Sequence, residues 1–412
     1  MDGADFAEAK FTGPAVFDDT HFCNEADFSL AEFHAEASFT NVEFGKQAHF
    51  AGTKFLKEVS FYKAIFQGTA DFAHCHFEQG SYYQTQFVGD ANFRAAEFVR
   101  AQYGAAVFRS AAIFEHAVFA RVDFLTAHFG SVANFMAAHF NTEVEFHRSV
   151  FAGPTYFLHA TFAAEKAAFK QVKFLDTAEF QFSRFDGTGK FDLCTFDKMA
   201  NFSEVSVRAA SFTEAEFVGT AHFEYMKSTS TVDFEKAIFR GEAFFRDVRF
   251  EGGTRFRKTI FEKNTTFANG SLWTADFESA RFVGDASFSR TYLACAQQFT
   301  YVEQHRKFTG VATFCKAFFG GTAYFTDALL GGPVDFSRAI FGGPALFSLN
   351  PVSGTSPQSG QQRGQPSRGI PAEDARKLLV YAFASEMIEL VELDEIRASL
   401  IPCLSLTTSI RK

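Results

Sequence analysis

Phenylalanine recurs along this chain in alternating steps of five and six residues. In the stretch ADFSLAEFHAEASFTNVEF, which begins at Ala26, it occupies Phe28, Phe33, Phe39 and Phe44, and a small residue stands two positions before each ring. A half-buried strand repeats every two residues and a helix every 3.6. On a helix, a step of about 5.5 residues would place successive rings near opposite sides, so no single apolar stripe would form.

A square solenoid accounts for the spacing. Side chains alternate in extended chain, so each ring and the residue two positions before it point to the same side. The next two or three residues turn a corner, and four sides of five, six, five and six residues make a coil of 22. Each ring then lies over the ring of the previous coil at about 4.8 Å, a spacing that suits offset stacking. The spacing therefore predicts a stack of Phe6, Phe28, Phe50 and Phe72.

This pattern extends from Phe6 to Phe347, a span of 341 residues that predicts about fifteen coils. Further predicted core rings are Phe140, Phe151, Phe162, Phe185 and Phe196. Five positions that should carry a ring hold another residue instead: Val207, Ser228, Leu272, Leu293 and Leu330. The spacing slips where Tyr83 is taken as a ring position four residues before Phe87, and most strongly between Phe299 and Phe308.

The repeated unit, alanine, a polar residue, phenylalanine and two variable residues, resembles the pentapeptide repeat family. The tripeptide ADF at Ala4–Phe6, Ala26–Phe28, Ala70–Phe72 and Ala275–Phe277 carries the resemblance most closely. It covers roughly residues 4–347 and implies an all-β fold, a right-handed quadrilateral β-helix. The chain departs from the common family pattern in using phenylalanine almost exclusively and in alternating five and six, which resembles a Phe-rich subgroup.

Three segments follow from the composition. Residues 1–347 form the predicted β-helix, and residues 348–372, rich in Gly, Pro, Ser and Gln, form a predicted disordered linker. Residues 373–412 form a predicted helical tail with apolar residues at helical spacing: Leu378, Leu379, Ala382, Phe383, Met387, Leu390 and Val391. We expect this helix to cap the rod or to pair with a second copy. Some family members dimerise through the C-terminal end, so the resemblance also implies a homodimer there.

The composition of the chain bears on its cellular location and on the partners that it can bind. The mean hydropathy is −0.06 and no stretch of about 20 apolar residues occurs, so we expect no membrane insertion. The start of the sequence shows no signal peptide, and the six cysteines form no CxxC pair, which together predict free thiols and a cytoplasmic location. The net charge of −9 disfavours direct nucleic-acid binding.

Candidates for chemistry are few. His74-Cys75-His76 should not converge on a metal, because neighbouring side chains alternate. Gly187-Thr188-Gly189-Lys190 lacks the Ser or Thr that completes a phosphate loop. A filled interior leaves no substrate pocket, so we expect no enzyme, no catalytic residue, no metal and no cofactor. The best candidates for contact with a partner lie in the longest interruption of the repeat: Tyr301, Glu303, His305 and Arg306.

Two functions remain open at the level of sequence. The first is a non-catalytic scaffold rod that binds a protein partner, of unknown identity, through its outer faces. The second is implied by the resemblance, because some family members inhibit a topoisomerase such as gyrase by mimicking DNA. The solenoid holds 41 acidic residues against 32 basic ones, but Lys and Arg interrupt every acidic track. These basic residues between the acidic ones favour the scaffold function over DNA mimicry.

Overall fold

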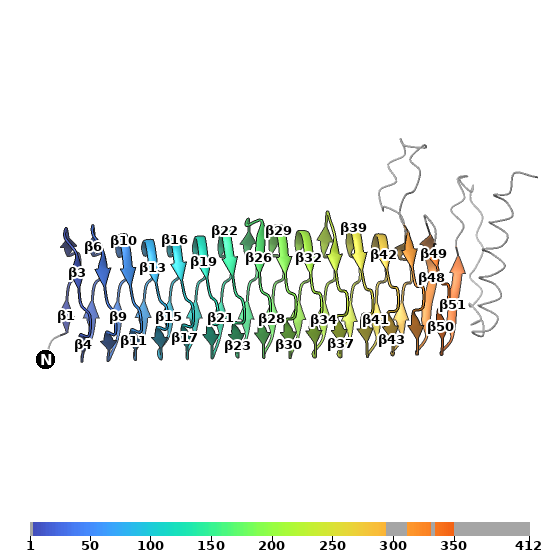
Figure 1. The fold of residues 1–412 in the computed structure, drawn as a ribbon, viewed down its shortest axis with the longest axis horizontal. Helices are drawn as coiled ribbons and strands as arrows, with labels where there is room; N and C mark the ends of the chain where they lie inside the picture. The colour runs from blue at the N-terminus through green and yellow to red at the C-terminus, as the bar shows by residue number, and fades with distance from the viewer. Residues whose placement is uncertain (1–2, 294–310, 331–333, 350–412) are drawn as a thin grey trace, which may run out of the picture.

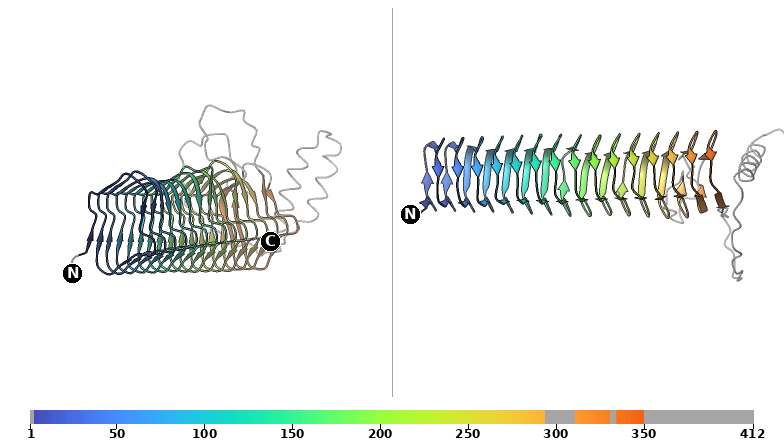
Figure 2. Two further views of the ribbon diagram at one scale, coloured as in Figure 1. Left: turned by 60° about the vertical axis from the view of Figure 1, so that its left-hand side comes forward. Right: turned by 90° about the horizontal axis from the view of Figure 1, so that it is seen from below.

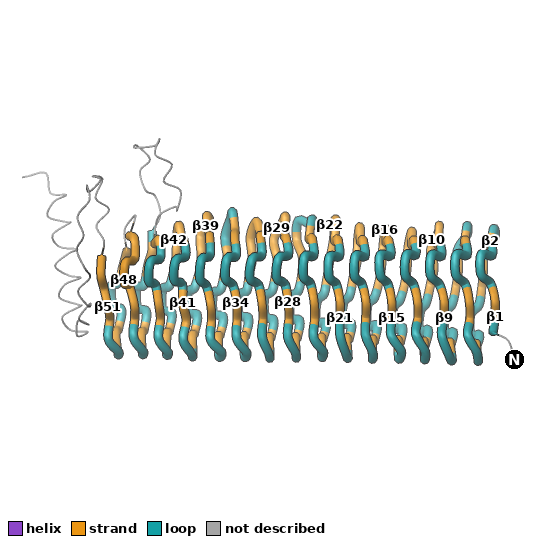
Figure 3. Tube along the Cα trace, turned by 180° about the vertical axis from the view of Figure 1, so that it is seen from behind, coloured by secondary structure: helices purple, strands orange, loops and turns teal. Residues whose placement is uncertain are grey.

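The computed structural model describes residues 3–293, 311–330 and 334–349, and within them the chain winds into a straight, elongated rod (Figure 1). The rod is a parallel β-solenoid of about fifteen coils, stacked from the N-terminal end onward (Figure 2). Short strands alternate with corners in every coil (Figure 3). No helix occurs in these residues, and so none that is long and apolar enough to cross a membrane. The predicted all-β solenoid is confirmed.

Each coil has four sides, which we name A, B, C and D after the rings that first mark them, Phe6, Phe11, Phe17 and Phe22. Side A consists of β1 (Ala4–Asp5), β5 (Ala26–Asp27), β9 (Ala48–His49), β12 (Ala70–Asp71), β15 (Ala91–Asn92), β18 (Ala112–Ile113), β21 (Ala133–Asn134), β24 (Thr155–Tyr156), β28 (Ala178–Glu179), β31 (Ala200–Asn201), β34 (Ala221–His222), β38 (Ala243–Phe244), β41 (Thr265–Thr266), β44 (Ala286–Ser287), β48 (Ala323–Leu330), which runs on into side B, and β51 (Ala345–Leu349). Side D consists of β4 (His21–Phe22), β8 (Glu43–Phe44), β11 (Ile65–Phe66), β14 (Gln86–Phe87), β17 (Val107–Phe108), β20 (His128–Phe129), β23 (Val150–Phe151), β27 (Lys173–Phe174), β30 (Thr195–Phe196), β33 (Glu216–Phe217), β37 (Ile238–Phe239), β40 (Ile260–Phe261), β43 (Arg281–Phe282), β47 (Phe318–Phe319) and β50 (Ile340–Phe341).

Sides B and C share strands, because several strands continue around the corner between them. They consist of β2 (Lys10–Phe11), β3 (Ala15–Val16), β6 (Glu32–Phe33), β7 (Ala37–Ser38), β10 (Lys54–Ser60), β13 (His76–Ser81), β16 (Glu97–Gln102), β19 (Val118–Asp123), β22 (His139–Glu145), β25 (Thr161–Phe162), β26 (Lys166–Ala168), β29 (Arg184–Lys190), β32 (Ser206–Ser211), β35 (Lys227–Ser228), β36 (Val232–Asp233), β39 (Arg249–Arg255), β42 (Ser271–Asp276), β45 (Tyr292–Leu293), β46 (Ala312–Thr313) and β49 (Val334–Asp335).

The rings form four columns along the axis of the rod. Phe28 lies over Phe6 at 4.8 Å between ring centroids and under Phe50 at 4.9 Å, with nearly parallel planes. Between sides A and C the rings meet edge to face instead, as Phe28 and Phe39 do at 5.4 Å and 90°. Both geometries are favourable for aromatic pairs. The predicted stack continues to Phe72, and the predicted rings Phe140, Phe151, Phe162, Phe185 and Phe196 are buried in their columns.

The coil length varies in a way that corrects two details of the sequence reading. Tyr82, not Tyr83, occupies the ring position: Tyr82 is buried and stacks 5.1 Å from Phe61, whereas Tyr83 is 46 % exposed. The step from Phe77 to Tyr82 is therefore a normal five, and this coil is shortened to 21 residues, as the pairing of Ala70 with Ala91 shows. Because two tyrosines follow each other in the sequence, the spacing alone did not show which of them occupies the ring position.

The longest interruption is larger than the nine residues expected between Phe299 and Phe308. Leu293 on side B pairs with Leu330, 37 residues later, and Phe314 stacks directly on Phe277 at 4.8 Å. The ring position after Leu293 is therefore Phe314, and residues 294–310, which contain Phe299 and Phe308, lie outside the described residues.

All five replacements of a ring fall in one column. The register of side B aligns Phe185, Val207, Ser228, Phe250, Leu272, Leu293 and Leu330. Where the ring is replaced by Ser228, the inward residue two positions earlier is the large Met226 instead of alanine. The exchange of sizes keeps the interior filled, as close packing requires.

The corners after sides A and C are tight turns with a left-handed residue. In the turn Phe28–Ala31, the Ala31 amide donates to the Phe28 carbonyl at 3.1 Å, and Leu30 has φ 57°. Gly52 is the one glycine among the thirty positions of this kind in the described residues. A left-handed conformation costs a non-glycine residue about 1–2 kcal/mol. The coil-to-coil backbone hydrogen bonds hold these residues, as the Leu30 amide shows by donating to Ala51 at 2.9 Å.

Replacing a stacked ring by a charge should be severe. Phe140 is fully buried between Phe119 at 5.3 Å and Phe162 at 4.7 Å. We expect Phe140→Asp to lower the free energy of unfolding by about 4 kcal/mol or more, because an unpaired carboxylate would be buried among rings. His139→Ala, one residue earlier on the outer surface, should change it by at most about 0.5 kcal/mol. Urea unfolding followed by circular dichroism measures both, and equal midpoints would contradict the filled axis.

The corner conformation predicts opposite effects for two adjacent alanines. Ala137 has φ 53°, so Ala137→Gly relieves the left-handed cost and should raise the free energy of unfolding by about 0.5 kcal/mol. Ala138 is fully buried in extended chain, so Ala138→Gly should lower it by about 1 kcal/mol. Thermal unfolding of the two variants under identical conditions checks the sign, and destabilisation by both would be inconsistent with the corner geometry.

Candidate interaction surface

The four partner-contact candidates, Tyr301, Glu303, His305 and Arg306, lie outside the described residues. Their point of attachment is nevertheless fixed by the strands on either side. The chain leaves the solenoid after β45 on side B and returns at β46 on side C. The interruption is therefore inserted at the corner between sides B and C, and the rest of the surface has to be judged from the described coils.

Many outward acids of the repeat have a structural task. In the ADF unit, the aspartate or asparagine accepts a hydrogen bond from the backbone amide two residues later. Asp27 Oδ1 accepts from Ser29 at 2.8 Å, and Asp71 Oδ1 accepts from Ala73 at 3.1 Å. Such side-chain caps are characteristic of Asp and Asn at turns. The polar position of the motif therefore stabilises a corner, and its charge is not by itself evidence for a partner.

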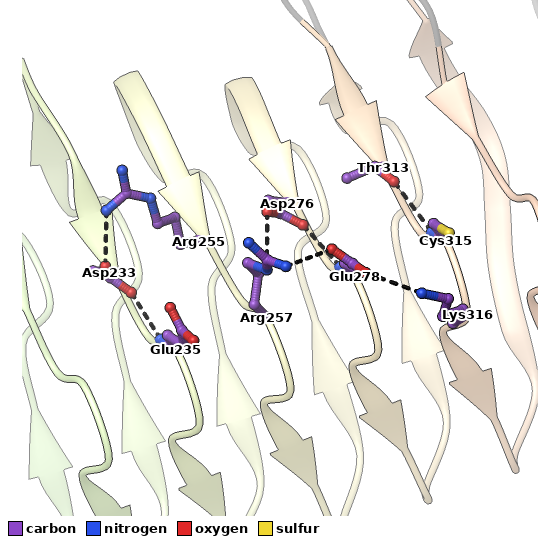
Figure 4. A network of polar contacts seen from close by, with 9 residues as sticks. All are labelled: Asp233, Glu235, Arg255, Arg257, Asp276, Glu278, Thr313, Cys315 and Lys316. Atoms are coloured by element: carbon purple, nitrogen blue, oxygen red, sulfur yellow. Dashed lines mark hydrogen bonds and ion pairs between the residues drawn. The ribbon is translucent and has the colours of Figure 1, made fainter.

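Other outward charges pair with opposite charges on the next coil (Figure 4). On side C, Asp233 meets Arg255 at 3.1 Å, and Arg257 meets Glu278 at 2.7 Å. Glu278 also meets Lys316 at 3.4 Å. Exposed pairs of this kind contribute at most about 1 kcal/mol each, but they neutralise the surface locally. Acidic and basic side chains alternate in these coils, so this part of side C carries no continuous acidic track.

Glu32 on side B stands between two lysines. Its carboxylate lies 3.3 Å from Lys10 and 3.1 Å from Lys54, one coil below and one coil above. Hydrogen bonds from Lys54 and Lys10, together with their charges, lower the pKa of Glu32 from 4.5 to about 2. The carboxylate therefore stays ionised at any physiological pH.

A groove of about 320 Å³ lies at the corner between sides A and B. It crosses the coils in which Val207 and Ser228 replace rings. Its six lining side chains form no hydrogen bond or ion pair with any other described side chain, unlike the paired charges of side C. They are Glu204, Tyr225, Lys227, Asp247, Arg249 and Asn269.

The left-handed corner conformation positions the side chains that line one wall of this groove. Glu204, Tyr225, Asp247 and Asn269 occupy successive left-handed corner positions on side A, with φ between 56° and 59°. Lys227 and Arg249 stand beside them on β35 and β39 of side B, paired in register. An acidic row and a basic row thus run along the rod, with the Tyr225 ring, 53 % exposed, between two acids. The rows are held by rigid backbone.

A second groove of about 370 Å³ lies at the corner between sides B and C, lined by Glu78, Gln79, Val99, Arg100, Arg121 and Thr142. Arg100 lies in register with Arg121. Arg121 is already paired with Glu143 at 2.6 Å, so this groove has fewer free charges.

The cysteines and the two chemical motifs are structural in the described coils. Cys75 and Cys194 are buried and donate to backbone carbonyls of Phe50 and Phe169 at 2.9 and 2.8 Å. Burial raises the pKa of both thiols well above the ordinary value. His76 points outward, 3.5 Å from Glu97, and no metal-binding group of His, Cys, Asp and Glu occurs within the described ranges.

The phosphate-loop fragment Gly187–Lys190 belongs to strand β29. Gly189 is buried at the inward position before Phe191, and a Cβ on Gly187 would meet the Glu165 carbonyl oxygen at 2.1 Å. The glycines therefore serve close packing between coils and do not form an anion loop.

A four-column aromatic interior with small inward partners defines a repeat protein of the β-solenoid class. Residues 1–43, 39–82 and 50–97 each match a family model that describes pentapeptide repeats in nine copies. The ring columns of sides A, C and D continue to Phe347, Phe336 and Phe341. The first 97 residues are therefore built of pentapeptide repeats, and the coils that follow continue the same architecture. Searches of curated proteins and of solved structures found no match.

The groove between sides A and B was not foreseen from the sequence. A signal was present, because Met226 before Ser228 reverses the usual order of a small residue before a large one. That reversal marks a coil beneath the groove. The outward residues above it follow no repeat, so their arrangement required the register.

The environment of Glu32 predicts a pH dependence. A carboxyl whose pKa is lowered on folding stabilises the native state above its unfolded value, near 4.5, and this contribution disappears as the pH falls towards 2. We expect the carboxyl carbon of Glu32 to titrate near pH 2 by NMR, and near 4.5 in the double variant Lys10→Met and Lys54→Met. An unchanged midpoint in that variant would show that the lysines are not the cause.

Proposed function

We propose that this protein is a non-catalytic rod that binds a protein partner through its outer surface. The observation that carries the proposal is the filled axis: four columns of buried rings occupy the place where a solenoid could have held a ligand. What varies along the rod is the set of outward side chains, and these can change without disturbing the core. Long, stiff repeat proteins of this kind suit contacts at several points.

The groove between sides A and B is the contact that we propose first. Its six side chains are free of other described partners, so a ligand would not have to break existing ion pairs. The rigid coils already hold Lys227, Arg249 and Asp247 in place, which lowers the ordering cost of binding. A partner segment that offers an acidic group to the basic row and a basic group to Glu204 and Asp247 would complement both walls.

The rival function is regulation of a topoisomerase such as gyrase by DNA mimicry. It would require a continuous acidic side, and the pairs of Asp233 with Arg255 and of Glu278 with Lys316 work against one on side C. The same charge balance and the net −9 argue against direct nucleic-acid binding. We therefore keep mimicry as the function to be tested against the scaffold.

Two further expectations stay predictions. The four described cysteines are all free, and Cys23 is exposed, which supports a reducing, cytoplasmic location. The homodimer expected at the C-terminal end involves residues outside the described ones, so its test is the oligomeric state of the full chain.

Charge reversal in the groove tests the proposed contact. The immobilised full-length protein is used to capture partners from a lysate of the organism that makes it, and each captured protein is quantified for three forms. We expect one partner to bind the wild type but not Lys227→Glu with Arg249→Glu. The matched control, Lys173→Glu with Lys198→Glu, makes the same change of charge on exposed residues of side D and the corner after it, and should retain that partner. Loss in both variants, or in neither, would overturn the groove as the contact.

A supercoiling assay separates the rival function. Inhibition of gyrase at stoichiometric amounts of the rod, relieved by neutralising the acids of one side, would replace the scaffold with mimicry. No inhibition at large excess would remove mimicry.

A further inference from the structure

Side D carries an apolar patch over its C-terminal coils. Ile238, Ile260, Phe318 and Ile340 point outward from β37, β40, β47 and β50, and Val283 lies beside them. Ile340 is 56 % exposed and Val283 is 47 % exposed. Single exposed apolar residues are ordinary, but four apolar residues in five successive positions of one row, interrupted by Arg281, mark a contact surface. We call these five residues the side D patch.

The edge of the patch carries no side chain in the last two coils. The position directly after each ring of side D holds Val218, Arg240, Glu262 and Val283 in four coils, and then Gly320 and Gly342. Neither glycine has a positive φ, and a Cβ on Gly342 would find its nearest neighbour at 3.4 Å, an ordinary contact. The fold therefore does not demand glycine at 342, whereas a body lying against the patch would.

We propose that the predicted helix of residues 373–400 covers the side D patch of its own chain. The apolar row of that segment runs from Leu378 to Val391, roughly 20 Å at 1.5 Å per helical residue. The patch runs over four coil steps from Ile238 to Ile340, about 19 Å at 4.8 Å per coil. The two apolar surfaces match in length.

The linker is long enough to bring the predicted helix to the side D patch. The last described strand, β51, ends at Leu349 on side A, nine residues after Ile340 on side D. Residues 350–372 make 23 residues of Gly-, Ser- and Gln-rich chain, with an average end-to-end distance of about 26 Å. The helix can therefore lie along the patch without strain in the linker. An attached segment binds at high effective concentration, which favours it over a separate copy.

The charges are complementary as well. In helical spacing, the apolar row of this segment is accompanied by Glu386 and Glu389. Arg281 lies inside the row, between Ile260 and Phe318, with its guanidinium 5.2 Å from the centre of the Phe318 ring. A second base, Lys263, is exposed in the preceding coil. Neither base forms an ion pair with another described residue. Attraction between these groups would fix the position of the helix along the side.

Hydroxyl-radical footprinting of the full-length protein tests the proposal, with the oxidation rates of Phe318 and Ile340 as the readout. Phe383→Asp with Met387→Asp places charges in the apolar row and should raise both rates several-fold. Gly342→Lys changes the rod instead of the helix: it places a long side chain at the edge of the patch, which should block the helix. It should therefore also raise the oxidation rate of Phe318. The rates of Val107 and Val150, on the same side of the N-terminal coils, should not change.

Two matched variants control for unrelated effects. Ser385→Asp changes the opposite face of the predicted helix, and Gly130→Lys changes the same position of side D far from the patch; neither should alter the rates. Unchanged rates at Phe318 and Ile340 in all variants would overturn the proposal. Rates in the wild type that fall with rising protein concentration would also overturn it, because a second copy would then be the cover.

Discussion

The fold depends on a coincidence of two distances. Parallel strands hydrogen-bond at about 4.8 Å, and aromatic rings stack comfortably at the same separation. A ring at the same place in every coil can therefore be stacked without stretching the backbone ladder, as the 4.9 Å between Phe28 and Phe50 shows. The edge-to-face contacts between sides A and C then close the axis. Small inward residues and tight corners are consequences of fitting four rings into one coil.

The corners convert this regular interior into a variable exterior. Left-handed residues are normally glycine or asparagine, yet here Leu30, His74, Tyr225 and Lys236 occupy such positions. Because neighbouring coils hold the corner through the backbone, its side chain is free to vary. This freedom makes an unpaired set of polar side chains such as Glu204, Tyr225 and Asp247 possible on a rigid frame.

Much of the fold was readable from the sequence, because the period of the rings is set by geometry alone. The stack through Phe72 and the replaced rings at Val207 and Ser228 were located correctly. The choice between Tyr82 and Tyr83 could not be made, since both fit the spacing within one residue. The end of the interruption was misplaced because Phe308 preserves the period by chance. The groove depends on which outward residues become neighbours across coils, and that follows from the register of each shortened or lengthened coil.

The direction of the backbone hydrogen bonds has a mechanical consequence. Bonds between coils, such as that from the Phe28 amide to the His49 carbonyl at 2.7 Å, lie along the axis of the rod. A force that pulls the two chain ends apart loads only the outermost coil, which peels away before the next one feels the load. Each event would release about 22 residues, or roughly 75 Å of extended chain. The rod is thus stiff against bending but yields to tension one coil at a time.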